Sequence, residues 1–490
     1  MDGLGGASRP RGDITTLLDL ATRDSQDDYF TPLNTDATWF TRDQERRNRP
    51  FVPAVQNFAF RGPAAFGQRF SFDIGSIACG DLLFGVLLQI KLGHWFDQTT
   101  VLRIQSGRYT YKYPEQAWYY ANSLGTVMIE KAELEVEDQI IETIDGDFGF
   151  SIARLLTDLN NQVGYNVDGT GFTNIQRLKT WPQHRVFPTE NGNTIALLPF
   201  FFSRTALRAA FPLIACREGT VRIHITLRPF TDCVRIASGL RADCTETPLG
   251  KTFEFIDNGY PFKPTIQITA SRDIPQFRDL ELITSGAYLN GVIRQQMIRQ
   301  PFEIMHRGVQ TWRFTEPLKY LANKQFGDTI TVQLPLEANH PMEEIIWFVR
   351  RKAALVYNNE WTNYTSVISA EYNATYNPTA PMMVSAQIQI NGIELISAGE
   401  EYFRQLISRH HKGGIAGYAS FLYGYPFARN PAEHQPSGTL NASRTQSLRL
   451  TLTVTPPGGN LNQEWEVVVF VVGLRWTRFE NGICNKMFTD

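Results

Sequence analysis

Two pairs of side chains in this sequence have a spacing that could support catalysis or metal binding. Asp145 and Asp147 could act as the acid and base of a glycosidase, which needs two carboxylates around the scissile bond. The surrounding residues 143–149 predict a turn, a context that says little about catalysis. His410 and His411 are adjacent, and on a helix adjacent side chains diverge by about 100°. We therefore interpret them as a solvated helix end, where protonated imidazoles complement the helix dipole.

No string of residues completes a catalytic or cofactor motif. Gly250-Lys251-Thr252 ends like a phosphate-binding loop, but Thr245 stands where that loop requires its first glycine. The glycine-rich residues 413–424 neither follow a predicted strand nor open a predicted helix, which indicates a flexible loop. The strings GxSxG, HExxH and HxH do not occur in the sequence. We therefore expect no catalytic, cofactor-binding or metal-binding residues, and a protein that is not an enzyme.

Composition excludes several classes of protein. The chain has 490 residues, of which 42% are hydrophobic and 20% charged, so it is neither disordered nor collagen-like. The 47 basic residues nearly balance the 49 acidic ones, which excludes a generally basic nucleic-acid coat. Acidic residues interrupt the four arginines within residues 42–49, so we interpret that cluster as a solvated surface without specific nucleic-acid binding.

Targeting and redox features are equally sparse. The five cysteines are too few and too irregularly spaced for a disulfide framework or a zinc site, so we expect reduced thiols. The first 13 residues contain no apolar stretch, and no secretory signal peptide is predicted. The longest apolar runs, Leu82–Ile90 and Val467–Leu474, fall short of the ~20 residues of a membrane-spanning helix. We expect no insertion into a membrane.

Alternation of apolar and polar residues is the dominant pattern. It is strict in Lys131–Glu137, Val221–Arg228 and Leu448–Thr455, which predicts half-buried antiparallel strands. The nearly continuous apolar runs Ile345–Val349 and Val467–Val472 predict strands that are covered on both faces.

Helical periodicity is limited to three short segments. They are Ile14–Ala21, Ser151–Gln162 and Tyr402–Ile407. Asp13 is a suitable N-cap for the first, which explains the tripeptide Arg11-Gly12-Asp13 better than an adhesion motif. Because these helices do not alternate with strands, we predict an all-β chain with a few short inserted helices.

The sequence also repeats itself. Residues 131–138 align without a gap to residues 385–392, with Leu134 and Ile388 at matching inward positions. In both copies an amphipathic helix is expected within about twenty residues. We place a boundary within residues 272–290, where Pro, Gly and charged residues break the strand pattern. This divides the chain into an N-terminal arm with a short helix (1–50) and two β domains (51–280 and 281–490).

Several strings resemble segments of one viral protein family. Residues 435–444, QPSGTLNASR, resemble the QPSG-x-x-N-x-SR segment of major capsid proteins of nucleocytoplasmic large DNA viruses. Four further matches occur in the family's order: residues 28–31 (DYFT) and 80–82 (GDL), the pair LPFFF at 198–202 and FPLIA at 211–215, and HPMEEIIW at 340–347. Phe30 replaces the family's Leu, and Thr445-Gln446 replace its Ile-Asp, which leaves the viral lineage open.

The resemblance implies two consecutive eight-stranded antiparallel jelly rolls, a double jelly roll. It also implies a structural capsid protein whose homotrimers form pseudo-hexagonal capsomers of an icosahedral shell. Neighbouring capsomers and minor capsid proteins beneath the shell would be its partners, with an inner viral membrane as a neighbour rather than a site of insertion. The protein would lie in the virion and assemble inside the host cell.

A carbohydrate-binding or glycoside-hydrolysing β-sandwich is the alternative from another class. The 33 Phe, 18 Tyr and 9 Trp could line a sugar platform, although Phe more often fills cores. Three glycosylation sequons begin at Asn363, Asn373 and Asn441. Without a signal peptide we interpret them as chance occurrences, and we expect the first two in a long exposed loop over residues 357–381.

Overall fold

The computed structural model describes most of the chain that follows residue 50. The described residues are 51–93, 118–121, 124–156, 193–204, 210–236, 240–247, 250–257, 265–267, 276–315, 328–351, 361–362, 364, 381–411, 421–431, 435–455 and 465–487. The expected helix at residues 14–21, the arginines at 42–49 and the string at 28–31 lie outside them. Residues 51–490 form one compact unit.

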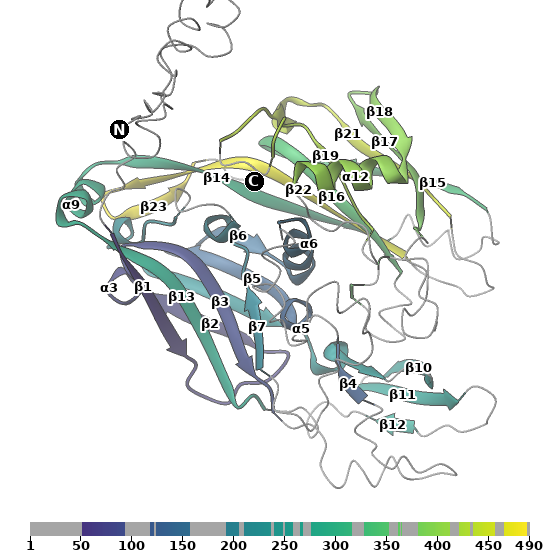
Figure 1. Cartoon of the computed structure of the whole chain (residues 1–490), viewed down its shortest axis with the longest axis horizontal. Helices are drawn as coiled ribbons and strands as arrows, with labels where there is room; N and C mark the ends of the chain where they lie inside the picture. The colour runs from purple at the N-terminus through teal and green to yellow at the C-terminus, as the bar shows by residue number, and fades with distance from the viewer. Residues whose placement is uncertain are drawn as a thin grey trace, which may run out of the picture. The chain divides into compact units, whose positions relative to one another are not determined.

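The first jelly roll consists of two four-stranded antiparallel sheets (Figure 1). One has the order β1 (Phe51–Ala59), β13 (Asp279–Leu289), β3 (Leu82–Lys91) and β7 (Asn193–Leu197). The other has the order β2 (Arg69–Ile74), β8 (Val221–Leu227), β5 (Ile129–Val136) and β6 (Gln139–Ile144).

The second jelly roll repeats this arrangement. One sheet has the order β14 (Phe302–Phe314), β22 (Trp465–Glu480), β16 (Pro341–Arg351) and β19 (Leu422–Pro426), with β20 (Leu440–Asn441) beside β16 and β23 (Ile483–Lys486) beside β22. The other has the order β15 (Ile330–Leu336), β21 (Leu448–Val454), β17 (Met383–Ile390) and β18 (Ile393–Gly399). The predicted double jelly roll is confirmed.

Small sheets and short helices complete the described part. The sheets are β10 (Leu240–Thr247), β11 (Gly250–Asp257) and β12 (Thr265–Gln267), and the pair β4 (Trp118–Tyr120) and β9 (Val234–Ile236). The α-helices are α3 (Ser76–Cys79), α5 (Leu124–Val127), α6 (Gly146–Leu156), α8 (Phe201–Arg204), α9 (Gly291–Arg299) and α12 (Glu400–His410). The 3-10 helices are η4 (Leu213–Ala215), η5 (Phe230–Cys233) and η7 (Ala442–Arg444).

Alternating residues place one face of each sheet in the core. In β8, for example, Val221, Ile223 and Ile225 are buried, whereas Arg222 between the first two is half-buried. Aromatic side chains connect the two sheets of the first jelly roll, since Phe60, just after β1, packs against Phe70 of β2 with ring centroids 4.9 Å apart. The runs in β16 and β22 are buried on both faces, as their sequences predicted.

The internal repeat extends to the irregularities of the strands. The β5–β6 pairing shifts register after Leu134, and the β17–β18 pairing shifts after Ile388. Both side chains are fully buried. The turns that follow also match, because Glu137 and Asp138 have positive φ and so do Asn391 and Gly392, as a two-residue hairpin of type I′ requires.

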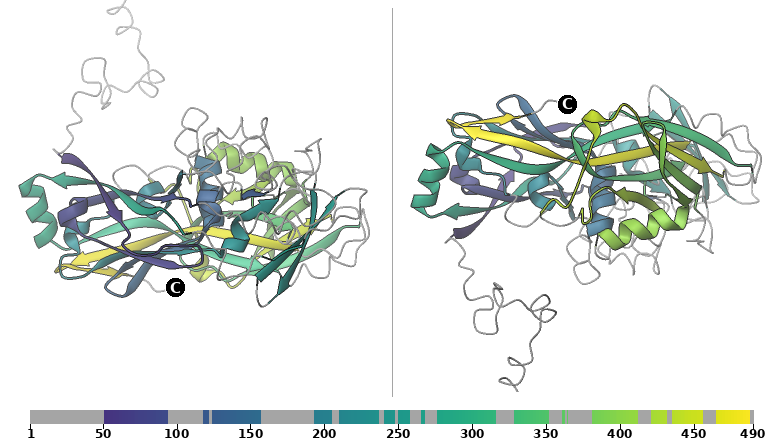
Figure 2. Two further views of the ribbon diagram at one scale, coloured as in Figure 1. Left: turned by 90° about the horizontal axis from the view of Figure 1, so that it is seen from below. Right: turned by 90° about the horizontal axis from the view of Figure 1, so that it is seen from above.

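Each copy of the hairpin leads into a helix of 11 residues, α6 in the first jelly roll and α12 in the second. Figure 2 shows both helices, α6 in blue and α12 in light green. α12 confirms the helix predicted around residues 402–407. α6 begins at Gly146, five residues before the predicted start at Ser151, so the predicted turn over residues 143–149 is wrong.

Two further expectations differ from the structure. The strand pattern does not break over residues 272–290, because β13 occupies Asp279–Leu289 and pairs with β1 and β3. The position 280/281 chosen as the domain boundary therefore falls inside a strand of the first jelly roll. The loop expected over 357–381 is not exposed throughout, since Tyr364 is buried and stacks on Phe348 with a centroid distance of 4.0 Å.

Replacing Leu134 or Ile388 by Ala should lower the free energy of unfolding by about 2–5 kcal/mol, because each change leaves a cavity in a packed core. Urea titration followed by tryptophan fluorescence measures this. Ile77→Ala is the control, since Ile77 is 90% exposed, and it should cost less than about 0.5 kcal/mol. Equal losses in all three variants would contradict the core assignment.

Candidate functional site

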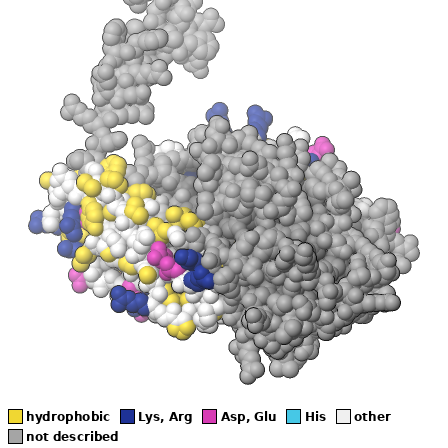
Figure 3. Space-filling model, turned by 60° about the horizontal axis from the view of Figure 1, so that its bottom comes forward, with side chains coloured by type: hydrophobic (Ala, Val, Ile, Leu, Met, Phe, Trp, Pro, Cys, Tyr) yellow, Lys and Arg dark blue, Asp and Glu magenta, His cyan; other side chains and the backbone are white. Residues whose placement is uncertain are grey.

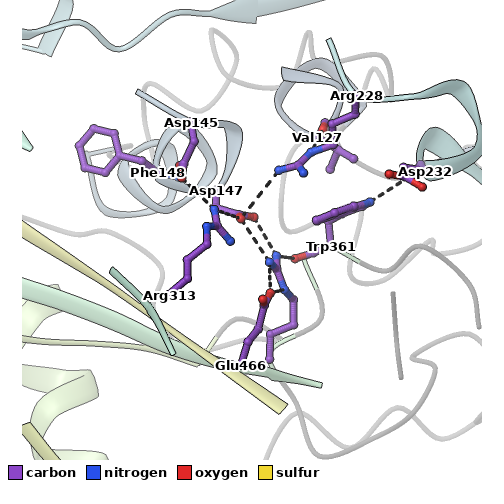
Figure 4. A network of polar contacts seen from close by, with 10 residues as sticks. Val127, Asp145, Asp147, Phe148, Arg228, Asp232, Arg313, Trp361 and Glu466 are labelled. Carbon is purple, nitrogen blue, oxygen red and sulfur yellow. Dashed lines mark hydrogen bonds and ion pairs between the residues drawn. The ribbon is translucent and has the colours of Figure 1, made fainter. Parts of the chain in front are cut away.

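A buried network of charges joins the two jelly rolls (Figure 4). Asp147 in the first turn of α6 provides its acidic centre and is 4% exposed. Its carboxylate accepts hydrogen bonds from Arg350 of β16, with Oδ1–Nη1 2.7 Å and Oδ2–Nη2 3.2 Å. Arg313 of β14 donates to the same carboxylate at 2.7 Å. The first jelly roll thus inserts an acid between two arginines of the second.

Arg350 is completely buried and fully engaged. Besides Asp147 it binds Glu466 of β22, its partner in the strand register, with Nε–Oε1 2.7 Å. Its Nη1 also donates to the backbone carbonyl of Trp361 at 2.8 Å. All three nitrogens of this guanidinium group donate hydrogen bonds to acceptors. This is the condition under which a buried charge is tolerated.

Arg228 extends the network within the first jelly roll. Its Nε donates to the carbonyl of Val127 at 2.8 Å, and its guanidinium lies 3.8 Å from the ring centroid of Trp361. The indole N–H of Trp361 in turn donates to the carbonyl of Asp232 at 2.9 Å. A cation–π contact and a hydrogen bond therefore tie Trp361 of the second jelly roll to the connection between β8 and β9 in the first.

Asp145 and Asp147 lie in opposite electrostatic environments. Burial raises the pKa of Asp145, and the neighbouring charge of Asp147 raises it further, against the opposing effect of Arg313. Burial also acts to raise the pKa of Asp147, but Arg350, Arg313 and Arg228 outweigh it, so this pKa lies well below its ordinary value. Asp147 is held ionised by the second jelly roll.

This arrangement explains why the two carboxylates are close together. Asp145 caps α6, because its Oδ1 accepts the N–H of Phe148 at 2.7 Å. Its other oxygen binds Arg313 at 2.8 Å. Both acids are thus engaged by the helix and by arginines at an interior junction. The pair serves packing between domains, and nothing in its geometry favours the glycosidase alternative.

Aromatic rings line the same junction. Phe148 of α6 packs edge-on against Phe470 of β22, with a centroid distance of 5.3 Å. Phe201 of α8 stacks on His306 of β14 at 4.1 Å. Apolar burial around the charges removes water from them, which strengthens each ion pair.

The prediction that both histidines at the end of α12 are solvated is wrong for His411. His411 follows the helix, is 5% exposed, and places Nε2 2.7 Å from Oε2 of the buried Glu344. Burial lowers the pKa of His411, but the charge of Glu344 and its hydrogen bond outweigh that effect, so the pKa is raised. His410 is half-buried and its pKa is lowered by burial.

The remaining candidates have structural placements or lie outside the described residues. Gly250–Thr252 opens strand β11 and forms no phosphate loop. Leu422–Gly424 belong to β19, so the glycine-rich stretch ends in a strand, and residues 412–420 are not described. Asn441 lies exposed in β20, whereas Asn363 and Asn373 lie outside the described residues.

Reduced cysteines were also expected. Cys79, Cys216, Cys233 and Cys484 are buried free thiols. The described residues contain no cluster of three or more His, Cys, Asp or Glu side chains that could hold a metal. None of the described helices is long and apolar enough to span a membrane.

The strings behind the family resemblance meet one another in space. The N–H of His340, at the start of HPMEEIIW, donates to Oγ of Ser443 in the QPSGTLNASR string at 2.8 Å. Asp81 of the GDL string accepts the N–H of Leu289 at 2.8 Å and pairs with Arg294 at 3.2 Å. These strings therefore fix loops and strand ends, which is a structural role.

Sequence reasoning did not identify Arg313, Arg350 or Glu466 as site residues. The sequence nevertheless contains a pattern that could have identified two of them. Arg350 follows the apolar run Ile345–Val349, and Glu466 precedes the run Val467–Val472. Opposite charges at the ends of two fully buried strands indicate an interior ion pair.

Comparison with known proteins gives one consistent result. A family model described as large eukaryotic DNA virus major capsid protein matches residues 294–475, and a model of the major capsid protein N-terminus matches residues 38–268. Together they cover most of the chain. The major capsid protein of Paramecium bursaria Chlorella virus 1 is 24% identical, over 89% of this chain and 86% of its own length. That of Wiseana iridescent virus is 21% identical, over 95% and 92%.

Solved structures show the same fold. The crystal structure of PBCV-1 VP54, fitted into a reconstruction of the virophage Sputnik, matches with a TM-score of 0.64 and 18% identity, over 91% of this chain and 98% of that one. The Faustovirus major capsid protein matches with a TM-score of 0.59 and 12% identity, over 95% and 96%.

Asp147→Asn should destabilise the protein by about 3–5 kcal/mol, because it leaves Arg350 buried without a full counter-charge. The free energy of unfolding at pH 7 measures this. Asp73→Asn removes a carboxylate that is 80% exposed although it contacts Arg222, and it should cost less than about 1 kcal/mol. A loss no larger than that of the control would show that the network does not stabilise the fold.

His411 should make stability depend on pH. Because its pKa is raised in the folded state, its pairing with Glu344 contributes stability below the unfolded pKa of about 6.5. That contribution is lost as pH rises through the folded pKa. The fall in unfolding free energy between pH 6 and pH 8 should therefore shrink in His411→Gln. His410→Gln is the control, and because its pKa is shifted the other way it should not reduce that fall.

Proposed function

This chain belongs to the family of major capsid proteins of large eukaryotic DNA viruses, and on that premise we propose that three copies form one capsomer of an icosahedral shell. Each copy contributes two jelly rolls of the same sheet order, so a trimer presents six similar blocks in a pseudo-hexagonal arrangement. The buried junction around Asp147 and Arg350 carries the proposal, because it makes the two blocks of a chain one rigid unit.

Several finer features belong to the same proposal. Neighbouring capsomers and minor capsid proteins beneath the shell are the partners, in a virion assembled inside the host cell. The protein acts without catalysis, without specific nucleic-acid binding and without insertion into a membrane. We propose an arm over residues 1–50 followed by two domains. The first was expected over 51–280 and the second over 281–490, and we extend the first to Leu289 because β13 pairs with β1.

Near-neutral net charge suits this role. The formal net charge is −2 for 490 residues, so repulsion between many closely packed copies is small. The carbohydrate-binding or glycosidase alternative would need accessible carboxylates or an exposed aromatic platform. The pair considered for it, Asp145 and Asp147, binds arginine, and a glycan-binding assay should give no interaction.

The purified protein should be a homotrimer with a mass of three times 55.7 kDa. Light scattering coupled to size exclusion measures the mass, and negative-stain images should show pseudo-hexagonal particles. A protein that stays monomeric at all concentrations would contradict the proposal. Failure to form complete shells would not, because shells also require minor proteins.

A further inference from the structure

We infer that the outer face of the β1-β13-β3-β7 sheet is the docking surface for helix α12 of a second copy of this chain. The inference rests on the proposed function, since it requires self-association, and it adds which two surfaces meet. Its basis is the contact between α6 and the β14-β22-β16 sheet inside the chain, which serves as a template for the contact between copies.

The template covers the outer face of the second jelly roll. Phe348 and Arg350 of β16 and Phe470 of β22 point to this face, away from the core that Trp347 enters. All are fully buried. α6 places Asp147 on Arg350 and Phe148 on Phe470, and Tyr364 stacks on Phe348. A sheet that would otherwise expose this face is thereby covered on both sides.

The corresponding face in the first jelly roll is the outer face of the β1-β13-β3-β7 sheet, and no described helix covers it as α6 covers the sheet of the second jelly roll. The bulge between β3 and β13 leaves Phe84 without a register partner, and the bulge between β16 and β22 leaves Glu343 without one. Lys91 lies seven residues after Phe84, and Arg350 lies seven residues after Glu343. Lys91 and Arg350 therefore hold equivalent positions in the two sheets.

The same bulges fix the match between β13 and β22. Gly286 and Gly473 hold equivalent register positions beside them. Ile283 lies three residues before Gly286, and Phe470 lies three residues before Gly473, so Ile283 and Phe470 hold equivalent positions. The register therefore assigns each residue of the open face a counterpart on the covered one.

Exposure differs sharply between the equivalent positions. Lys91 is exposed and Ile283 half-buried, whereas their counterparts on the covered face are fully buried. Val55 of β1 is 69% exposed, although Val309, at the same register position in β14, is half-buried. Figure 3 shows hydrophobic side chains among charged ones over this part of the molecule.

The complementary surface lies on α12. Because α6 and α12 follow matching hairpins and have the same length, Glu401 corresponds to Asp147 and Tyr402 to Phe148. Tyr402 is 46% exposed, whereas Phe148 is fully buried. Glu401 is exposed as well. The second jelly roll therefore presents an exposed acid and a partly exposed aromatic ring, and none of the described sheets of the same chain covers them as β16 and β22 cover Asp147 and Phe148.

The signs of the charges agree with docking between copies. Asp147 meets Arg350 within the chain, and Glu401 would meet Lys91 of the next copy. Tyr402 would pack on Ile283 as Phe148 packs on Phe470. The strand before α12 adds apolar surface, because Ile393 and Leu395 of β18 are 73% and 46% exposed. The counterpart of β18 in the first jelly roll is β6, which packs against β14. Because β1 is the counterpart of β14, β18 would face β1 of the next copy.

A second copy is the occupant that this arrangement requires. The two surfaces are different and lie on different jelly rolls, so each copy offers one and accepts the other. Such head-to-tail contacts form closed rings when the rotation closes. When the contact between copies has the same geometry as the contact inside the chain, three chains complete a ring of six jelly rolls.

Charge reversal tests the pairing. Glu401→Lys and Lys91→Glu should each weaken the trimer, raising its dissociation constant tenfold or more, because like charges then face each other in the contact. The double variant should restore association to near the wild-type value, since it re-forms the pair with the charges exchanged. Sedimentation equilibrium of the full chain over a range of concentrations gives the constants.

Glu130→Lys is the matched control, since Glu130 is an exposed acid on β5, outside both proposed surfaces, and it should leave association unchanged. Thermal melting of each variant checks folding. A wild-type trimer that both single variants leave intact, or that the double variant fails to restore, would overturn the inference while the proposed function stands. A wild-type chain that never associates would overturn both.

A crosslink provides a second test that does not depend on charge. Glu401→Cys combined with Lys91→Cys should give covalent dimers and trimers under oxidation, visible on non-reducing gels and lost with reductant. Cys79, Cys216, Cys233 and Cys484 are buried. Cys244→Ser, introduced into every chain of this experiment, removes the fifth native thiol, so the chain with Glu401 and Lys91 intact should remain uncrosslinked. Monomer bands alone for the double-cysteine variant of a trimeric protein would refute the contact.

Discussion

The contact between Asp147 and Arg350 is the constraint on which the arrangement of the two jelly rolls depends. Each charge is buried, and each belongs to a different jelly roll. Burying a single charge is costly by several kcal/mol, whereas a pair with complete hydrogen bonding is tolerated. Only one relative placement of the blocks gives Asp147 both Arg350 and Arg313. Other placements would leave an uncompensated charge, so the network selects a unique geometry as well as contributing stability.

Two copies of one fold thus acquired different surfaces. The face that α6 covers in the second jelly roll is apolar apart from the charged residues Arg313, Arg350 and Glu466, which form the buried network. The strands β16 and β22 are hydrophobic on both faces. The equivalent face of the first jelly roll carries Gln89, Lys91 and Glu281 beside Ile283. These polar residues keep the open face compatible with water in the single chain, and the apolar side chains beside them are those that the inferred partner would bury.

The sequence predicted much of the fold because strand periodicity is local. β8 and β21 followed from alternation, and the repeat followed from one hairpin whose bulges and turn agree in both copies. β13 was missed because its Thr284-Ser285-Gly286 segment is typical of a loop. Gly286 is required there, since a Cβ would lie 2.0 Å from the carbonyl oxygen of Cys79. The charge network was beyond local analysis, because Asp147 and Arg350 are 203 residues apart. His411 was misjudged because it leaves the helix and turns inward to Glu344.

The repeat also explains why assembly should end in a ring. A surface that binds its own copy produces a two-fold dimer, in which all contacts are used at once. Here the helix face that carries Glu401 and the sheet face that carries Lys91 are separate, and the chain already joins one such pair internally. Because the internal pair fixes the angle between successive blocks, a contact of the same geometry between chains repeats that angle. The proposed pseudo-hexagonal capsomer requires this angle to be one sixth of a turn. The ring then closes after six blocks, which is three chains, and leaves neither surface open.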